Sequence, residues 1–439
     1  MRISKVGALA SVAVLTFAAC GTGGTASNAP SASASGGASG SPAGGGDTSK
    51  GTVKIAIELP LQGSELAAAQ PIINGIRLAI KDAGGAAGGY AITQPQEAVF
   101  DDAVNGAHDP QQGAKNMTSI VSDADTVAVI GPLNSSVAQT EIPVSNEGEL
   151  LQCSPANTNP NLTKGDAAKQ IRPAGKPNNY IRVVTTDDFQ GPAAATYLYK
   201  TLGAKSVFII DDTETFGKGI ADAFEQQFKK EGGTIVDHVG VPKTTTDYAS
   251  IMTAAASKNP AGIYFGGVTA TGGARILKAA VAAGLTVPYV AGDGINDGSG
   301  KSENSFLNIA GADAKNSFST LAGIGDFPAK QTFNAAYKAE YNTDATGYAS
   351  TGYACAQVVI NAIGRAGAKA ADQAGMRVAT RDAGTDTSVS YDTILGKIQF
   401  DANGDTSQKI ISIYAFDQAG AEGKGDWVFK EQVDFASAG

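Results

Sequence analysis

The sequence predicts an α/β protein built from two lobes, each a doubly wound parallel sheet with helices on both faces. Short strands rich in β-branched residues alternate with helical patterns along the chain, which is the order of successive βαβ units. This pattern restarts after Gln190-Gly191-Pro192. The body of about 390 residues also exceeds one ordinary core, so two sheets are expected rather than one.

In the first array, continuous apolar runs indicate strands that are buried on both faces of a sheet. Isoleucines recurring at helical spacing after Pro71 predict the first helix. The turn residues Gly131-Pro132 end the third strand. The predicted elements are strand 53–57, helix 71–83, strand 97–100, helix 110–122 and strand 127–130.

The second array follows the same alternation after a helix that begins near Gln190. Its predicted elements are strand 206–210, helix 219–230, strand 234–238, helix 248–256, strand 262–265, helix 273–283 and strand 289–291. Farther on, Asn403-Gly404 is expected to be the turn of a hairpin between 398–400 and 410–414.

The first fifty residues predict export. Arg2 and Lys5 precede an apolar stretch over 7–19, which is shorter than the ~20 residues of a membrane span and is typical of a signal peptide. The small residues before Cys20 resemble a bacterial lipobox, although Phe17 stands where that motif usually has Leu. This resemblance implies that Cys20 becomes a lipidated N-terminus. Residues 21–50 are dominated by Gly, Ser, Ala and Pro, so a disordered tether is expected.

Composition excludes several classes of function. A formal charge of −9 disfavours nucleic acid or an anionic membrane surface as a partner, because both reward clustered Lys and Arg. Besides Cys20 the chain has only Cys153 and Cys355, and no CxxC motif is present. These two cysteines form either a disulfide or two buried free thiols. No metal and no cofactor are expected.

Polar segments at the predicted strand ends are the candidate site, since ligands of doubly wound sheets bind beyond the carboxyl ends of the strands. Ser135 and Thr158 follow two first-array strands, where hydroxyls and free N–H groups at a helix start can hold a carboxylate. Ordinary helix capping by these two residues is the structural alternative. Asp293, between two glycines, either presents its carboxylate to a cation or makes a turn.

In their order along the chain, these segments resemble type I periplasmic binding proteins, in particular the leucine/isoleucine/valine-binding receptors of ABC importers. The resemblance covers 53–434. Its motifs are Leu59-Pro60-Leu61-Gln62-Gly63, Asn74-Gly75, Phe100-Asp101-Asp102, Asp109-Pro110, Gly131-Pro132-Leu133-Asn134-Ser135-Ser136, Ser154-Pro155-Ala156-Asn157-Thr158-Asn159-Pro160, Gln190-Gly191-Pro192-Ala193-Ala194, Phe216-Gly217-Lys218-Gly219, Tyr264-Phe265-Gly266-Gly267 and Phe400-Asp401-Ala402-Asn403-Gly404-Asp405.

The resemblance implies a set of ligand contacts. Ser135 and Thr158 match positions that hold the carboxylate and the ammonium of an amino acid, and the backbone at Ala156 matches another ammonium contact. Asp293 matches an acid that pairs with the ammonium. The resemblance also makes Phe216 an aromatic that closes over the ligand. Val268 stands where leucine-type receptors have a second aromatic, so a wider or less polar side-chain pocket is expected.

The resemblance also implies an organisation and a role. Three connections, near Asp187–Gln190, Ser317–Leu321 and Ser407–Ile411, are expected to join the lobes as a three-strand hinge. The expected parts are a signal peptide (1–19), lipidated Cys20 with its tether (20–50), a first lobe (51–187 with 319–407) and a second lobe (188–318 with 408–439). A lipid-anchored, monomeric receptor that delivers an amino acid, first of all a branched-chain one, to ABC permease subunits is predicted. A ligand-sensing lipoprotein of the same fold is the alternative.

An enzyme is not expected. The chain has no GxSxG elbow and only two histidines. His108 is expected to be solvated at a helix start, and His238 to be a hydrogen-bonded residue at the end of a strand. Asp101-Asp102 and Asp211-Asp212 are adjacent, so on a strand their side chains point to opposite faces and form no catalytic pair. Gly294 lies one residue too far from Gly300-Lys301 for a phosphate loop.

Overall fold

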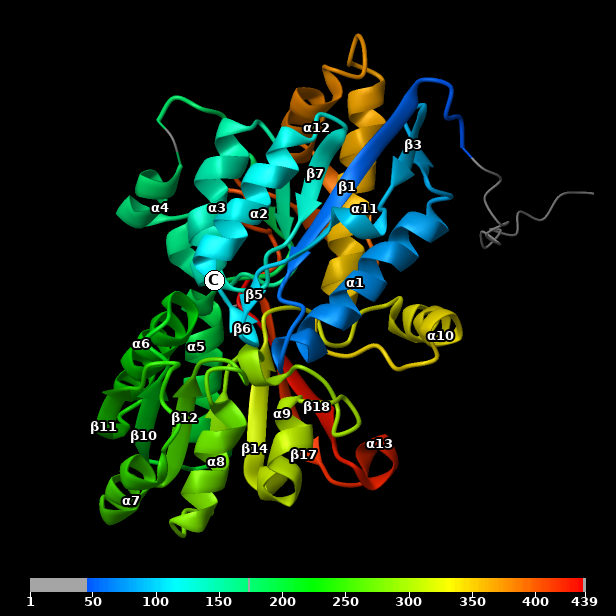
Figure 1. The fold of residues 1–439 in the computed structure, drawn as a ribbon. Helices are drawn as coiled ribbons and strands as arrows, with labels where there is room; N and C mark the ends of the chain where they lie inside the picture. The colour runs from blue at the N-terminus through cyan, green and yellow to red at the C-terminus, as the bar shows by residue number, and fades with distance from the viewer. Residues whose placement is uncertain (1–45, 173, 437–439) are drawn as a thin grey trace, which may run out of the picture. The chain divides into compact units, whose positions relative to one another are not determined.

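The computed structural model describes residues 46–172 and 174–436, and most of their strands belong to two large sheets, one in each lobe (Figure 1). The predicted signal peptide, Cys20 and the tether up to residue 45 lie outside the described residues. No helix among the described residues is long and apolar enough to cross a membrane.

The first sheet has the strand order β2-β3-β1-β7-β8-β9, and β4 pairs with the second half of β1. All these pairings are parallel except that of β2 with β3, as expected for βαβ units. Its strands are β1 (Gly51–Leu59), β2 (Ala86–Ala87), β3 (Tyr90–Thr93), β4 (Val99–Asp101), β7 (Thr126–Ile130), β8 (Leu151–Ser154) and β9 (Tyr180–Arg182).

Helices cover both faces of this sheet, because alternate residues of its strands are apolar on both sides. Ala56 of β1 packs in one core cluster with Met117 of α2, whereas Ile55 and Ile57 belong to the cluster that contains the apolar residues of α1 and α11. Figure 1 shows α2 and α3 on one side of β1 and β7, and α11 and α12 on the other. The helices are α1 (Glu65–Asp82), α2 (Pro110–Ser122), α3 (Ser135–Glu147), α4 (Gly165–Ile171), α10 (Lys330–Tyr341), α11 (Ala349–Gly367) and α12 (Met376–Gly384).

The second sheet has the order β11-β10-β12-β13-β14-β17-β18, with β11 to β14 parallel and β17 and β18 antiparallel to their neighbours. Its strands are β10 (Ser206–Asp211), β11 (Thr234–Gly240), β12 (Gly262–Gly266), β13 (Tyr289–Ala291), β14 (Ser317–Leu321), β17 (Ile410–Asp417) and β18 (Asp426–Asp434).

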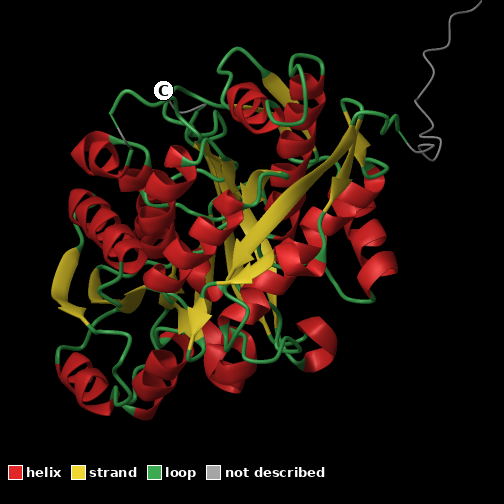
Figure 2. Cartoon of the chain, turned by 45° about the horizontal axis from the view of Figure 1, so that its top comes forward, coloured by secondary structure: helices red, strands yellow, loops and turns green. Residues whose placement is uncertain are grey.

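This second sheet is also covered on both faces (Figure 2). Val207 and Ile209 of β10 pack with Phe224 and Phe228 of α6, while the alternate residues Phe208 and Ile210 belong to the cluster that contains the apolar residues of α7 and α8. The helices are α5 (Asp187–Thr196), α6 (Thr215–Lys230), α7 (Ala249–Ser257), α8 (Gly273–Ala282), α9 (Phe306–Ala310) and α13 (Gly420–Gly423).

The chain passes between the two sheets three times: between β9 and α5, after β14, and before β17. The cysteines left open by the sequence form a disulfide, Cys153–Cys355, across 202 residues of chain. This disulfide joins β8 to α11 inside the core of the first lobe, so it links a strand that precedes the first passage to a helix that follows the second.

Two local expectations are wrong. The first helix begins at Glu65 and contains Pro71, rather than beginning at Pro71. The two strands expected to flank Asn403-Gly404 do not pair with each other: β16 (Gly396–Gln399) pairs with β15 (Ser390–Thr393), and β17 pairs with β14 and β18. Asn403-Gly404 does lie at the turn of a shorter hairpin: Phe400 and Thr406 form an antiparallel bridge, and the N–H of Ser407 donates to the carbonyl of Gln399 at 2.7 Å. A hydrogen bond from the N–H of Gly404 to the carbonyl of Asp401 closes this turn. The remaining short strands are β5 (Ala103–Val104) and β6 (Ala107–His108).

Candidate functional site

A cavity lies between the lobes, at the carboxyl ends of their parallel strands. We call it the interlobe cavity. The first lobe contributes the starts of α1, α3 and α11 and the segment after β8, and the second lobe contributes the start of α6 and the segments after β12 and β13. All six predicted ligand-binding residues line it. The lining residues are Ser64, Glu65, Ala68, Pro71, Leu133, Asn134, Ser135, Ala156, Thr158, Phe216, Val268, Thr269, Asp293, Gly294, Asn296, Asp297, Gly347 and Tyr348.

Ser135 is the first residue of α3 and is buried at the cavity wall. The residue before it, Asn134, makes no side-chain cap to the helix and instead donates from Nδ2 to Oε1 of Glu65 at 2.9 Å. The first-turn N–H groups of α3 therefore have no side-chain cap and can serve an anion. Capping by Ser135, the structural alternative, is wrong because Ser135 lies within the helix.

Gly131 sets the path by which the chain reaches Ser135. Its φ of +142° is open to glycine, and a Cβ at this position would come within 1.9 Å of the carbonyl oxygen of Glu58 on the neighbouring strand β1. The close approach of two backbones at the end of β7 therefore requires glycine and directs the following residues toward the cavity.

Ala156 and Thr158 lie in the loop between β8 and the short helical turn Pro160–Leu162. The hydroxyl of Ser154 accepts hydrogen bonds from the N–H groups of Ala156 (3.2 Å) and Asn157 (2.9 Å) and so closes the turn. Thr158 is buried and does not cap a helix, since Asn159 is the cap residue of the next helical turn. Its own carbonyl accepts from the N–H of Asp187 at 2.9 Å.

Asp293, directly after β13, places its carboxylate on the second-lobe wall. Gln190 donates to Oδ1 at 2.6 Å and the hydroxyl of Tyr348 donates to Oδ2 at 2.7 Å. Burial raises the pKa of Asp293 to about 6, against the two hydrogen bonds, which favour the charged form. Asp293 does open a short helical turn, Asp293–Ile295, but its carboxylate remains among the groups that line the cavity.

The remaining lining is largely apolar between these polar groups. Phe216, in the first turn of α6, lies against the backbone next to Asp293, since a Cβ at Gly292 would come within 3.3 Å of its ring. Val268 lies between β12 and α8, and the first lobe adds Ala68, Pro71 and Leu133. A ligand held here would meet the N–H groups at the start of α3 and the Glu65 carboxylate from the first lobe, the Asp293 carboxylate from the second lobe, and apolar side chains from both.

His108 is not solvated, and that expectation is wrong. Its ring and its backbone N–H both bond to the carboxylate of Glu65, at 2.8 and 2.6 Å, and both residues are buried. Burial opposes the charge of the ring, but the carboxylates of Glu65 and Glu214 raise the pKa of His108 to about 10. Since Glu65 lines the cavity, the charge of His108 balances one of its acids.

His238 lies on the edge strand β11 and is hydrogen-bonded, as expected. Its ring bonds to Glu225 at 2.5 Å and to Asp211 at 3.0 Å. Among the described residues, no group of His, Cys, Asp and Glu side chains could hold a metal ion.

Several cavity residues escaped the sequence analysis. Glu65 precedes Pro71, where the sequence predicts the start of the first helix, so it lies outside that predicted helix; a pattern search that tolerates Pro in the second turn would include it. Tyr348 and Gly347 enter the cavity from the chain after the second passage, with no local motif to mark them. Asn296 and Asp297 follow Asp293 closely, so proximity to that residue was their only signal.

Two parallel-sheet lobes with a cavity between them form the architecture of a solute-binding protein. A family model described as periplasmic binding protein matches residues 52–421, so the chain belongs to that family, whose members bind solutes and are not enzymes. Membership of this family implies an extracytoplasmic location.

Individual relatives agree with this assignment. The chain is 28% identical over 354 residues to the leucine-specific-binding protein of Salmonella typhimurium, covering 80% of this chain and 88% of the relative. It is 26% identical over 388 residues to a Leu/Ile/Val-binding protein homolog of Brucella abortus, covering 88% and 95%. The relatives are thus spanned almost in full.

Solved structures show the same fold. A leucine binding protein from Thermotoga maritima superposes with a TM-score of 0.72 at 24% identity, over 88% of this chain and all of the other. A solute-binding protein of R. palustris, solved with 4-hydroxybenzoate, gives 0.71 at 18% identity, over 87% and 97%. At these identities the likeness defines the type I fold, and the ligand must be argued from the cavity.

Proposed function

We propose that the chain binds an α-amino acid in the interlobe cavity and delivers it to an ABC importer. One observation carries the proposal: the uncapped start of α3 and the carboxylate of Asp293 line the same cavity from different lobes. An amino acid is a zwitterion, so it needs donors at its carboxylate and an acceptor at its ammonium. Ser135 would serve the carboxylate, and Thr158, the backbone at Ala156 and Asp293 would serve the ammonium.

The apolar lining supports a hydrocarbon side chain. Phe216, Val268 and Leu133 offer a surface that gains from burial of apolar groups. Two relatives are named for leucine or for leucine, isoleucine and valine, which supports a branched-chain amino acid as the first ligand to test. Val268 stands where leucine-type receptors have a second aromatic, so aromatic amino acids belong in the same panel.

The delivery role needs closure and a membrane partner. We propose hinged lobes formed by 51–187 with 319–407 and by 188–318 with 408–439, a lipid anchor at Cys20, and a monomer that meets the permease in its closed, ligand-bound form. A ligand favours that form only as far as it binds it better than the open form. The names of the relatives and the family support this role.

Titration calorimetry tests the ligand. The purified protein is unfolded and refolded to remove bound ligand and titrated with leucine, isoleucine, valine, phenylalanine and tyrosine. Micromolar or tighter binding is expected for at least one. Asp293→Ala and Ser135→Ala should each weaken it at least tenfold with an unchanged circular dichroism spectrum, because each removes a partner of a charged group. Unchanged affinity in both variants would contradict the proposed site.

A further inference from the structure

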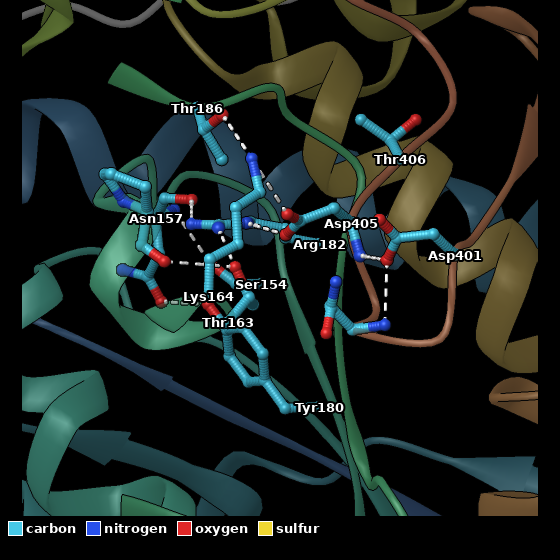
Figure 3. Close-up of polar contacts among 12 residues, drawn as sticks. Ser154, Asn157, Thr163, Lys164, Tyr180, Arg182, Thr186, Asp401, Asp405 and Thr406 are labelled. Carbon is cyan, nitrogen blue, oxygen red and sulfur yellow. Dashed lines mark hydrogen bonds and ion pairs between the residues drawn. The ribbon is translucent and has the colours of Figure 1, made fainter. Parts of the chain in front are cut away.

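Arg182 is the last residue of β9, and its side chain is completely buried. All of its hydrogen-bond partners are groups of this chain. Its Nε donates to Oδ1 of Asp405 at 2.8 Å, and its Nη2 donates to the hydroxyl of Thr163. Its Nη1 donates to the carbonyls of Asn157 at 3.1 Å and Asn159 at 2.8 Å. Figure 3 shows Asn157, Thr163 and Asp405 around the guanidinium.

The two carbonyls that Nη1 binds belong to the residues on either side of Thr158. The carbonyl of Thr158 itself accepts from the N–H of Asp187, at the start of α5. Three successive carbonyls of the Thr158 turn are therefore held by the guanidinium of Arg182 and by the first passage between the lobes. A planar guanidinium can bind several acceptors in fixed directions, which the single ammonium of a lysine cannot do.

The same guanidinium is attached to the third passage between the lobes. Asp405 lies between β16 and β17, and the N–H of Arg182 donates to the carbonyl of the adjacent Gly404 at 3.0 Å. Lys164 lies 3.3 Å from Oδ2 of Asp405 and 3.1 Å from Asp188 in the first turn of α5. Although burial opposes ionisation, Arg182 and Lys164 lower the pKa of Asp405, so this carboxylate is charged.

We propose that Arg182 is a positioning residue for ligand binding, which fixes the Thr158 turn of the cavity against the first and third passages between the lobes. The inference rests on the proposed function, because Thr158 matters here as a ligand contact. A buried ion pair adds little net stability once its desolvation is counted, so the geometry that Arg182 imposes is its larger contribution. Closure of the lobes and the placement of Thr158 are thereby coupled through one side chain.

The test compares two single variants with L-leucine as the probe, or with the tightest-binding amino acid of the panel. Arg182→Lys keeps a positive charge beside Asp405 but lacks the Nη1 contacts to Asn157 and Asn159. Asp405→Asn keeps those contacts and removes the charge. Affinity is measured by calorimetry well below each variant's melting temperature, so that only folded protein is compared, and stability is measured by urea unfolding.

We expect Arg182→Lys to weaken binding at least tenfold and Asp405→Asn to weaken it less than threefold, although both lower stability. A merely structural Arg182 would give two destabilised proteins with wild-type affinity, and that result would overturn the proposal. If Arg182→Lys does not fold, the double variant Arg182→Gln/Asp405→Asn takes its place, because it removes both charges of the pair. The same tenfold loss of affinity is then expected of the double variant.

The wild-type titration separates this inference from the function on which it rests. If the wild-type protein binds a panel amino acid and the Arg182 variant binds it equally well, only the positioning role is overturned. Wild-type protein that binds no member of the panel overturns the proposed function, and the positioning role with it.

Discussion

The hydroxyl of Tyr348, at the start of α11, donates to Oδ2 of Asp293 at 2.7 Å and so joins the two lobes through the proposed ammonium partner. The same hydroxyl accepts from the N–H of Ala322 at 3.3 Å, in the segment that follows β14. Tyr348 therefore links the second passage between the lobes to the cavity. This bond and the hydrogen bond from Gln190 together orient the carboxylate of Asp293.

Ligand binding should weaken in acid because Asp293 must be ionised to pair with an ammonium group. Burial raises its pKa to about 6, so above this value the carboxylate is charged and below it the group is neutral. The dissociation constant should be nearly constant from pH 8 to 7 and about tenfold larger at pH 5, measured by calorimetry.

Asp297 provides the control, since burial also raises its pKa, to about 7, and it lines the same cavity. Both of its carboxylate oxygens accept from the N–H of Phe306, at 2.9 and 3.2 Å. Asp297→Asn should keep the acid weakening, whereas Asp293→Asn should bind weakly at every pH. If the acid weakening disappears in Asp297→Asn, the titrating group is Asp297 and the prediction for Asp293 is contradicted.

Tyr348→Phe should weaken binding about three- to tenfold at pH 7 and move the acid midpoint upward. The lost hydrogen bond favours the charged form of Asp293, so without it the pKa of Asp293 rises further. Calorimetry across pH 5 to 8 checks both effects. A midpoint that moves downward would mean that Tyr348 does not stabilise the carboxylate.

The elements with strong local signals could be predicted from the sequence. The bounds of α2 are as expected because Asp109 caps it, accepting from the N–H groups of Gln111 and Gln112, and Pro110 occupies its first position. Strand β13 is bounded by turn residues on both sides and also has the expected limits.

The errors arise where a distant segment decides the outcome. His108 is buried because Glu65, far away in the chain, satisfies it. The hairpin at Asn403-Gly404 stops at the bridge between Phe400 and Thr406, because β14, β15 and β18 supply the partners of the two strands expected to flank it. The pairing of Cys153 with Cys355 and the position of Tyr348 in the cavity both depend on α11, which returns to the first lobe late in the chain. No local sequence pattern predicts that return.

Replacing both Cys153 and Cys355 with Ser should lower the free energy of unfolding by about 2–5 kcal/mol and leave ligand affinity unchanged. The disulfide closes a loop of 202 residues, so its loss frees a large part of the unfolded chain. It lies in the first-lobe core and does not line the cavity. Urea unfolding with and without reductant measures the change, and a variant as stable as the oxidised protein would contradict it.

A second polar link between the lobes involves Glu65 and His108 of the first lobe and Glu214 and Lys243 of the second. His108 lies 3.8 Å from Glu214, and Lys243 lies 3.2 Å from Glu214 and 3.5 Å from the carbonyl of His108. The neighbouring His108 lowers the pKa of Glu214 to about 2, while Glu65 and Glu214 raise the pKa of His108 to about 10, so the His108–Glu214 pair is charged at neutral pH. Since these contacts span the lobes, they favour the arrangement of the lobes seen in this structure, which is the form that would hold a ligand in the proposed function.

Lys243→Ala should therefore speed ligand dissociation up to about fivefold without changing the fold, because partly exposed ion pairs contribute at most about 1 kcal/mol. Stopped-flow release into excess competitor measures the rate, and the difference from wild type should shrink in high salt. Lys218→Ala is the matched control: Lys218 pairs with Asp222 on α6, within the second lobe, so it should leave the rate unchanged. Equal rates in the two variants would show that the pairing across the lobes does not hold the ligand in.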